Sequence, residues 1–289
     1  MKYAIRFYRG CRILNKADEI IIKYESTEPD LVRYVGSLPQ EQRLIVNITN
    51  LPIEQEENSL KIFEVAYKEH KNFAILCSFK QHILVDLDLL NIPYFFIEQA
   101  STFDEFVGML NFKVKDIYIT NELGFYLDKV SKICKDKDIQ VRVRPNMAQS
   151  SSVFETESVK KFFIRPEDTE FYEQYVDVFE FTGELTQQPV YYEIYRDGRW
   201  LGDLNEIIIG LTQSINDMAI LPVFHNRASC EKRCSFGKCD LCSRVVEVSK
   251  DIENKGLAIK REKRKYAGDE VSGDEDFAKE ISDPATADT

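Results

Sequence analysis

Short apolar or β-branched runs alternate with segments of helical periodicity along roughly the first 180 residues. The runs at 43–48 and 73–77 are apolar on both faces, as expected for strands of a parallel sheet that helices cover. The pattern predicts strands at 3–8, 19–24, 43–48, 73–77, 94–98, 116–120, 140–144, 161–165 and 178–181.

Helical patterns lie between these runs. Residues 59–70 carry apolar side chains at helical spacing, with a candidate cap at Asn58 or Ser59. Residues 101–110 open with Ser-Thr-Phe-Asp-Glu, which resembles a capping box, and 121–134 follow a strand directly. Alternating strands and helices indicate a parallel sheet, and eight or so strands without a glycine-rich phosphate fingerprint favour a TIM-barrel-like (β/α) barrel.

The C-terminal third of the chain departs from this alternation. Residues 191–201 predict a hairpin that turns at Asp197-Gly198, and 203–218 predict a helix. From about residue 250 the chain is charged and poor in apolar residues. We therefore expect an α/β barrel at 1–220, a small cysteine-rich metal-binding segment at 221–249, and a charged, flexible tail at 250–289.

The charge is unevenly distributed. The net charge is −11, of which residues 266–289 contribute −7 through eight acids and one lysine, so residues 1–265 carry −4. A mildly acidic body argues against a broad nucleic-acid footprint. The run 260–265 holds five basic residues. It is suited to contact phosphate groups, as in RNA, or an acidic protein partner. The alternative is that it forms a solvated helix end. The tail can bind a protein partner and fold on it.

The sequence predicts a protein without a membrane span. It contains no run of about 18 uncharged apolar residues, and the N-terminus resembles a strand rather than a signal peptide. The isolated Cys11, Cys77 and Cys134 fit a reducing environment. We therefore expect a cytoplasmic protein.

Four cysteines form the most distinctive motif of the chain. Cys230, Cys234, Cys239 and Cys242 are spaced C-x3-C-x4-C-x2-C. Thiolates this close repel one another unless a soft cation or an iron–sulfur cluster neutralises them, and neighbouring basic residues would lower their pKa. Metal binding is the favoured interpretation, with disulfides or free thiols as alternatives. His225 is a possible further ligand.

The spacing leaves the metal open. Structural zinc sites usually separate two close cysteine pairs by a long loop, whereas only four residues separate the pairs here. A compact run is closer to iron–sulfur ligation, although the ferredoxin spacing is not matched. A [4Fe–4S] cluster is therefore the first expectation and zinc the second.

Several short segments together carry a resemblance to a known family. They are 143–150 (VRPNMAQS), 163–168 (FIRPED), 171–172 with 176–180 (FY and VDVFE), and 226–234 (NRASCEKRC). These segments resemble the collagenase-like U32 peptidase family. The resemblance covers roughly residues 90–245. It implies a TIM-barrel-like fold. It also implies either peptidase activity or a role as an oxygen-independent hydroxylation factor for RNA bases or quinones that carries a [4Fe–4S] centre. The departure from the family pattern is the compressed cysteine spacing, and we also expect no further C-terminal domain after it.

Polar residues at predicted strand ends are the candidate catalytic groups, because functional side chains gather at the carboxyl ends of barrel strands. Arg144 and Arg165 each precede a proline and suit a carboxylate or phosphate, but nearby acids offer structural ion pairing instead. Glu167 and Asp168 offer an acid or base, but also fit a helix start after Pro166. The full candidate set is Arg144, Asn146, Gln149, Arg165, Glu167, Asp168 and Glu180.

Two functions from different classes follow. One is an enzyme with a U32-like barrel and an iron–sulfur cluster that modifies a nucleotide or another anionic substrate. The other is a non-catalytic scaffold with a structural zinc site. A U32-type peptidase is a third alternative, but the sequence contains neither an H-E-x-x-H motif nor a G-x-S-x-G motif, and a Cys77–His82 dyad is improbable.

Overall fold

The computed structural model describes residues 1–7, 16–24, 38–120, 123, 126–147, 164–209, 244, 247, 248, 250 and 251. Within these residues the strands are β1 (Lys2–Arg6), β2 (Glu19–Lys23), β3 (Arg43–Asn47), β4 (Phe73–Cys77), β5 (Tyr94–Phe96), β6 (Gln99–Ala100), β7 (Asp116–Ile119), β8 (Gln140–Val143) and β9 (Val178–Glu180). The helices are α2 (Ile53–Glu69), α3 (Leu84–Leu90), α4 (Phe103–Met109), α5 (Leu127–Asp136), α7 (Thr169–Tyr172) and α8 (Gln188–Asp197), with 3₁₀ turns η2 (Pro166–Asp168), η3 (Leu185–Gln187) and η4 (Leu204–Glu206).

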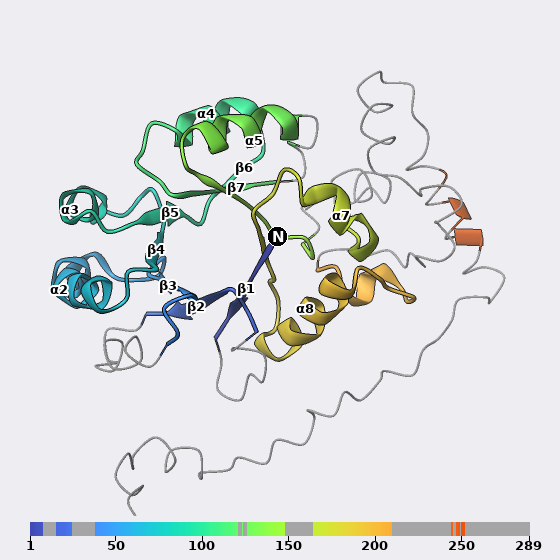
Figure 1. Cartoon of the computed structure of the whole chain (residues 1–289), viewed down its shortest axis with the longest axis horizontal. Coiled ribbons are helices and arrows are strands. Elements are labelled where there is room, and N and C mark those ends of the chain that lie inside the picture. The colour runs from blue at the N-terminus through green and yellow to red at the C-terminus, as the bar shows by residue number, and fades with distance from the viewer. Residues whose placement is uncertain are drawn as a thin grey trace, which may run out of the picture. The chain divides into compact units, whose positions relative to one another are not determined.

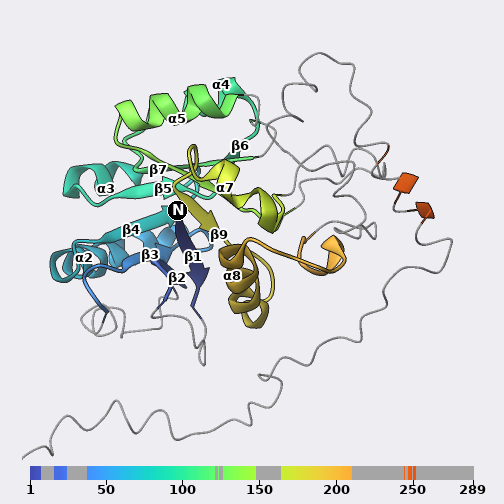
Figure 2. The same cartoon turned by 45° about the vertical axis from the view of Figure 1, so that its right-hand side comes forward.

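All nine strands form one parallel sheet in the order β5-β4-β3-β2-β1-β9-β8-β7-β6. β5 and β6, at the two ends of this order, are separated by only Ile97 and Glu98. The chain around 94–100 therefore pairs with β4 on one side and with β7 on the other, where Thr120 N donates to Ala100 O at 2.9 Å. The result is a nearly closed parallel barrel flanked by helices, which confirms the predicted α/β barrel (Figures 1 and 2).

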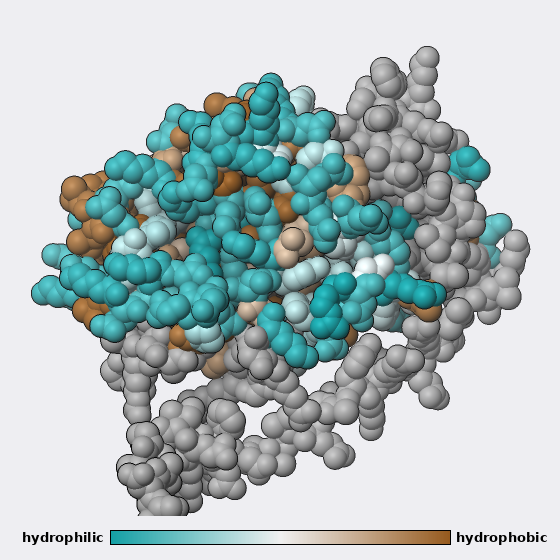
Figure 3. Space-filling model, viewed as in Figure 1, coloured by the Kyte–Doolittle hydropathy of each residue, from teal (hydrophilic) through white to brown (hydrophobic). Residues whose placement is uncertain are grey.

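Helices cover the outside of the strands, and this explains the continuous apolar runs. Every residue of β4 is buried, because its outward side chains pack against α2 while its inward side chains Ala74 and Leu76 fill the barrel. The outer surface in Figure 3 is mainly hydrophilic. Hydrophobic residues show near α3, where Val85 and Leu89 are exposed.

Most predicted elements are present, but their ends shift. The helix predicted at 59–70 begins at Ile53 with Pro52 as its N-cap, so the predicted cap at Asn58 or Ser59 was wrong. The helix predicted at 121–134 is described as α5, Leu127–Asp136. The capping box of α4 is confirmed: Thr102 accepts from the Glu105 amide, and Glu105 accepts from the Thr102 amide.

The hairpin predicted in the C-terminal part was wrong, and two further predicted elements differ from the structure in the part of each that is described. Residues 191–201 do not form a hairpin: they belong mainly to α8, which ends at Gly198 with φ 63°. Residues 164–165, predicted as a strand end, precede η2 instead. The described part of the predicted helix at 203–218 is the turn η4, followed by a bridge of Ile209 to Met147. Of the cysteine-rich segment at 221–249 only residues 244, 247 and 248 are described, and of the tail only residues 250 and 251.

Candidate functional site

Charged side chains fill the amino-terminal part of the barrel interior. Arg43 donates to both oxygens of Asp116 at 2.7 Å, and Arg142 Nη1 donates to Glu19 Oε2 at 2.6 Å and to Asp116 Oδ1 at 2.9 Å. The guanidinium of Arg142 also lies 4.9 Å from the ring centre of Phe95. Such hydrogen-bonded pairs offset the cost of burying charge. This group therefore connects β2, β3, β7 and β8 through inward side chains.

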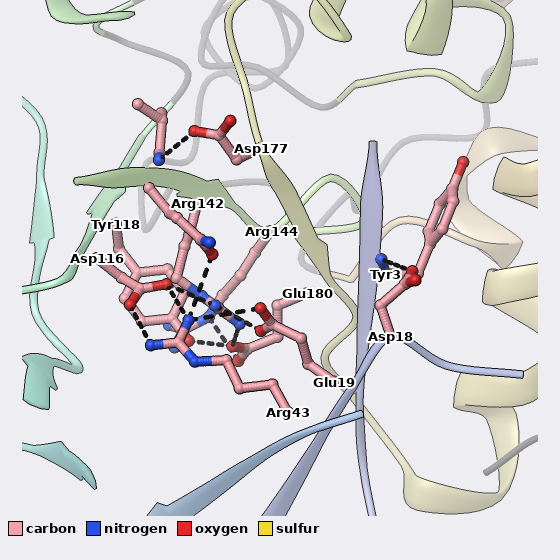
Figure 4. A network of polar contacts seen from close by, with 12 residues as sticks. Tyr3, Asp18, Glu19, Arg43, Asp116, Tyr118, Arg142, Arg144, Asp177 and Glu180 are labelled. Carbon is pink, nitrogen blue, oxygen red and sulfur yellow. Dashed lines mark hydrogen bonds and ion pairs between the residues drawn. The ribbon is translucent and has the colours of Figure 1, made fainter. Parts of the chain in front are cut away.

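A second polar group lies toward the carboxyl ends of the strands, where barrel proteins place their sites. We call it the mouth cluster: Arg6, Tyr118, Arg144 and Glu180. Arg6 and Glu180 end β1 and β9, and Arg144 directly follows β8. Figure 4 shows that Tyr118, Arg144 and Glu180 gather with the first group in one network. The register explains the assembly, because β9 lies between β1 and β8.

Glu180 is the centre of the mouth cluster. Its Oε1 accepts from Arg144 Nε at 3.3 Å and lies 3.7 Å from Arg6 Nη2, while its Oε2 accepts from the Tyr118 hydroxyl. Burial alone would raise the pKa of Glu180, but Arg144, Arg142 and Arg6 outweigh burial and lower that pKa below its ordinary value. The pKa of Tyr118 is raised by its burial and by Glu180, so the phenol remains a proton donor.

The guanidiniums at the mouth retain unused donors. The Arg144 side chain is only 8% exposed, and its Nη2 is buried without a hydrogen-bond partner. Arg6 Nε is likewise buried and unpartnered. Arg144 stacks on Tyr118 at 4.4 Å from the ring centre. The network as described contains four guanidiniums (Arg6, Arg43, Arg142, Arg144) and three carboxylates (Glu19, Asp116, Glu180). It therefore carries one surplus positive charge and buried donors suited to an oxyanion.

The predicted catalytic residues Arg165, Glu167 and Asp168 make contacts with groups outside the mouth cluster. Arg165 is 1% exposed and donates twice to Asp168 at 3.0 Å, which is the ion-pairing alternative named for it above. Glu167 Oε1 accepts from the Trp200 amide at 2.6 Å, and Pro166 opens η2 as the helix-start alternative predicts. The Arg165–Asp168 pair thus stabilises η2 locally, and Glu167 joins η2 to the segment after α8.

Asn146 connects the loops that follow β8 and β9. Its side chain donates to Thr182 O at 3.0 Å and accepts from Thr182 N at 3.1 Å, while its carbonyl accepts from Ile209 N at 2.8 Å. Asn146 is fully buried. It therefore holds the loops beside the mouth cluster in place. The predicted Gln149 lies outside the described residues.

The predicted metal ligands Cys230, Cys234, Cys239 and Cys242 also lie outside the described residues. In the described part of the chain, no group of three or more His, Cys, Asp or Glu residues is arranged to hold a metal ion. Cys77 is buried, its thiol contacts Phe95 O at 3.5 Å, and burial raises its pKa. A buried thiol with a raised pKa is a poor nucleophile, which argues against a Cys77–His82 dyad.

The sequence missed two members of the mouth cluster. Arg6 lies in a strand whose pattern predicts only structure, and Tyr118 is one aromatic residue among fourteen tyrosines. The available signal was the parity of each strand: a polar or aromatic residue that alternates with outward apolar residues, as Tyr118 does with Ile117 and Ile119, points into the barrel.

Comparison with known proteins yields no relatives: no family model, curated protein or solved structure matches the chain. The helices of the described segments are too short or too polar to cross a membrane. The geometry alone therefore defines the class, a (β/α)-barrel protein with a buried cationic cluster at its mouth.

Proposed function

We propose that this barrel binds an anionic ligand, through a carboxylate or phosphate group, at Arg6 and Arg144. The observation that carries the proposal is the buried Nη2 of Arg144, which has no partner beside a network with one surplus positive charge. A buried donor without a partner costs about 1–3 kcal/mol, and a bound oxyanion would remove that cost. The Arg6 side chain, 35% exposed, gives the anion an approach from solvent.

The resemblance to the U32 family extends this proposal to the substrate. We propose a nucleotide-containing or other anionic substrate, modified without oxygen, with the four cysteines holding a [4Fe–4S] cluster. Four thiolates suit such a cluster, and they also suit zinc. The isolated cysteines elsewhere fit a reducing, cytoplasmic setting in which the ligands stay available.

A non-catalytic scaffold with a structural zinc site is the second candidate. It is favoured by the internal contacts of Arg165, Glu167 and Asp168, which hold η2 and its surroundings together. In this alternative the barrel and its cysteine segment position a partner, for which the basic run and acidic tail offer charged contacts.

Titration with inorganic phosphate, followed by calorimetry, tests ligand binding. Arg144→Gln removes a charge-assisted contact worth about 1.5–3 kcal/mol, so we expect at least tenfold weaker binding. Arg144→Lys keeps the charge but loses the planar donor fork, and it should bind weakly as well. The control is Arg196→Gln, whose exposed side chain pairs with Asp197. Equal binding by wild type and both Arg144 variants would refute the site.

Anaerobic purification with metal analysis tests the cysteine segment. Absorbance near 400 nm with roughly four irons per chain, the load of one [4Fe–4S] cluster, would support the modification factor. One zinc per chain would favour the scaffold. Cys234→Ala should lower the metal content and the control Cys134→Ala should not, because Cys134 is buried in α5. A chain without metal would refute this part of the proposal.

A further inference from the structure

Glu180 is a fully buried carboxylate that depends on side chains from neighbouring strands. Arg144 and Arg6 face its Oε1 at 3.3 and 3.7 Å, while the Tyr118 hydroxyl and Arg142 Nη2 face its Oε2, the latter at 3.7 Å. The two oxygens therefore have different neighbours: the Oε1 side belongs to the mouth, and the Oε2 side to the barrel interior.

Arg142 cannot serve Glu180 alone. Its Nη1 already donates to Glu19 and Asp116 at 2.6 and 2.9 Å, so three carboxylates share one guanidinium. Arg43 pairs with two of these carboxylates and not with Glu180. The ionised state of Glu180 therefore rests on Arg144 first and then on Arg142 and Arg6, and two of these three guanidiniums, Arg144 and Arg6, are the ones that we assign to the anion.

We propose that Glu180 takes up a proton when an oxyanion binds to Arg6 and Arg144, so that the site couples anion binding to protonation. This inference rests on the proposed function. A second negative charge within a few ångströms of a buried carboxylate favours its neutral form. The proton comes from the solvent and stays on the carboxyl group, and no bond of the ligand changes. The charge of the cluster is then the same before and after a monoanion binds.

The consequence is tighter binding at lower pH. Since the bound state holds more protons than the free state, affinity rises as the pH falls, by at most about tenfold per pH unit for one linked proton. The site would thereby discriminate by pH as well as by charge.

Sulfate is the probe for this coupling, because its own charge stays constant between pH 5 and 8. Calorimetry at one pH in buffers of different ionisation enthalpy measures the protons taken up per sulfate, and a pH series measures the affinity. We expect proton uptake that increases toward pH 5, together with rising affinity. Sulfate binding without proton uptake would overturn the inference.

Two variants separate Glu180 from the other titrating groups. Glu180→Gln should bind sulfate with the uptake abolished, whereas the control Glu98→Gln should keep it, because Glu98 contacts Ser78 and Phe79 instead of the mouth cluster. Uptake that persists in Glu180→Gln would overturn the inference.

Tyr118→Phe provides an independent test if Glu180→Gln does not fold. Loss of the hydroxyl that donates to Glu180 weakens the stabilisation of the carboxylate, so the pH midpoint of proton uptake should move upward. An unchanged midpoint would contradict the inference.

The failures of the two proposals differ. Sulfate binding that Arg144→Gln weakens but that lacks proton uptake would overturn the coupling and leave the anion site standing. No binding of either phosphate or sulfate would overturn both.

Discussion

Replacing Arg142 with methionine should strongly destabilise the barrel. Arg142 is completely buried, and its Nη1 donates to Glu19 Oε2 at 2.6 Å and to Asp116 Oδ1 at 2.9 Å. Methionine fills much of the volume but leaves carboxylates without this counter-charge. Breaking a buried pair from one side costs about 3–5 kcal/mol. At about 2–4 °C per kcal/mol for a domain of about 150–250 residues, the size class of the barrel, that corresponds to a fall of roughly 6–20 °C in melting temperature.

Urea unfolding followed by circular dichroism measures this loss, and the helix pair Lys68–Glu64 provides the control. Its Nζ–Oε1 distance of 2.7 Å is similar to the distances in the Arg142 pairs, but the side chains of Lys68 and Glu64 are 64% and 39% exposed. Lys68→Met should therefore cost less than about 1 kcal/mol. A loss below 1 kcal/mol for Arg142→Met, or equal losses for the two variants, would refute the argument that burial sets the cost.

Three further predictions concern acid stability, capping and thiol reactivity. Buried guanidiniums overcome the pKa-raising effect of burial and lower the pKa of both Asp116 and Glu180, so their stabilisation is present above the unfolded pKa of about 4. This stabilisation should disappear as the pH falls through the lowered pKa values of the folded protein. Asp116→Asn should therefore lose less free energy of unfolding between neutral and acidic pH than the wild type does, as urea titrations can measure. Thr102→Ala removes the cap of α4 and should cost about 1 kcal/mol in the same assay, whereas no loss would refute the cap's role. Burial, with a smaller effect of Asp177, raises the pKa of Cys134 to about 12. Iodoacetamide at pH 8 should therefore leave this thiol unlabelled in the native protein, as mass spectrometry can check. Rapid labelling would contradict its burial.

The sequence predicted the barrel because parallel strands under helices are apolar on both faces. The prediction from sequence failed where one sequence pattern is compatible with two structures. The Asp197-Gly198 dipeptide is typical of a hairpin turn, but the same positive φ also ends a helix, and in α8 it does so. The tyrosines before it favour strands by propensity, yet Tyr191, Tyr192 and Tyr195 form the buried face of α8.

The candidate site was predictable only in part. Arg144 and Glu180 end predicted strands, and the structure brings them into contact. Arg6 joins them only through the pairing of β1 with β9, for which no local pattern exists. Arg165 was expected at the rim, but an acid three residues later pairs with it and both become buried. Whether an arginine faces a ligand or an ion-pair partner depends on such contacts, which spacing alone does not reveal.

The pairing of β1 with β9 also has a consequence for the synthesis of the chain. Lys2 lies opposite Val178, so one edge of β1 lacks its neighbour until about 176 further residues have been made. At about 5–20 residues per second this takes roughly 9–35 s. During that interval the nascent chain exposes an unpaired strand edge, a template for association with other chains. The same pairing brings Arg6 to Glu180, so the mouth cluster cannot be complete before β9 has been made.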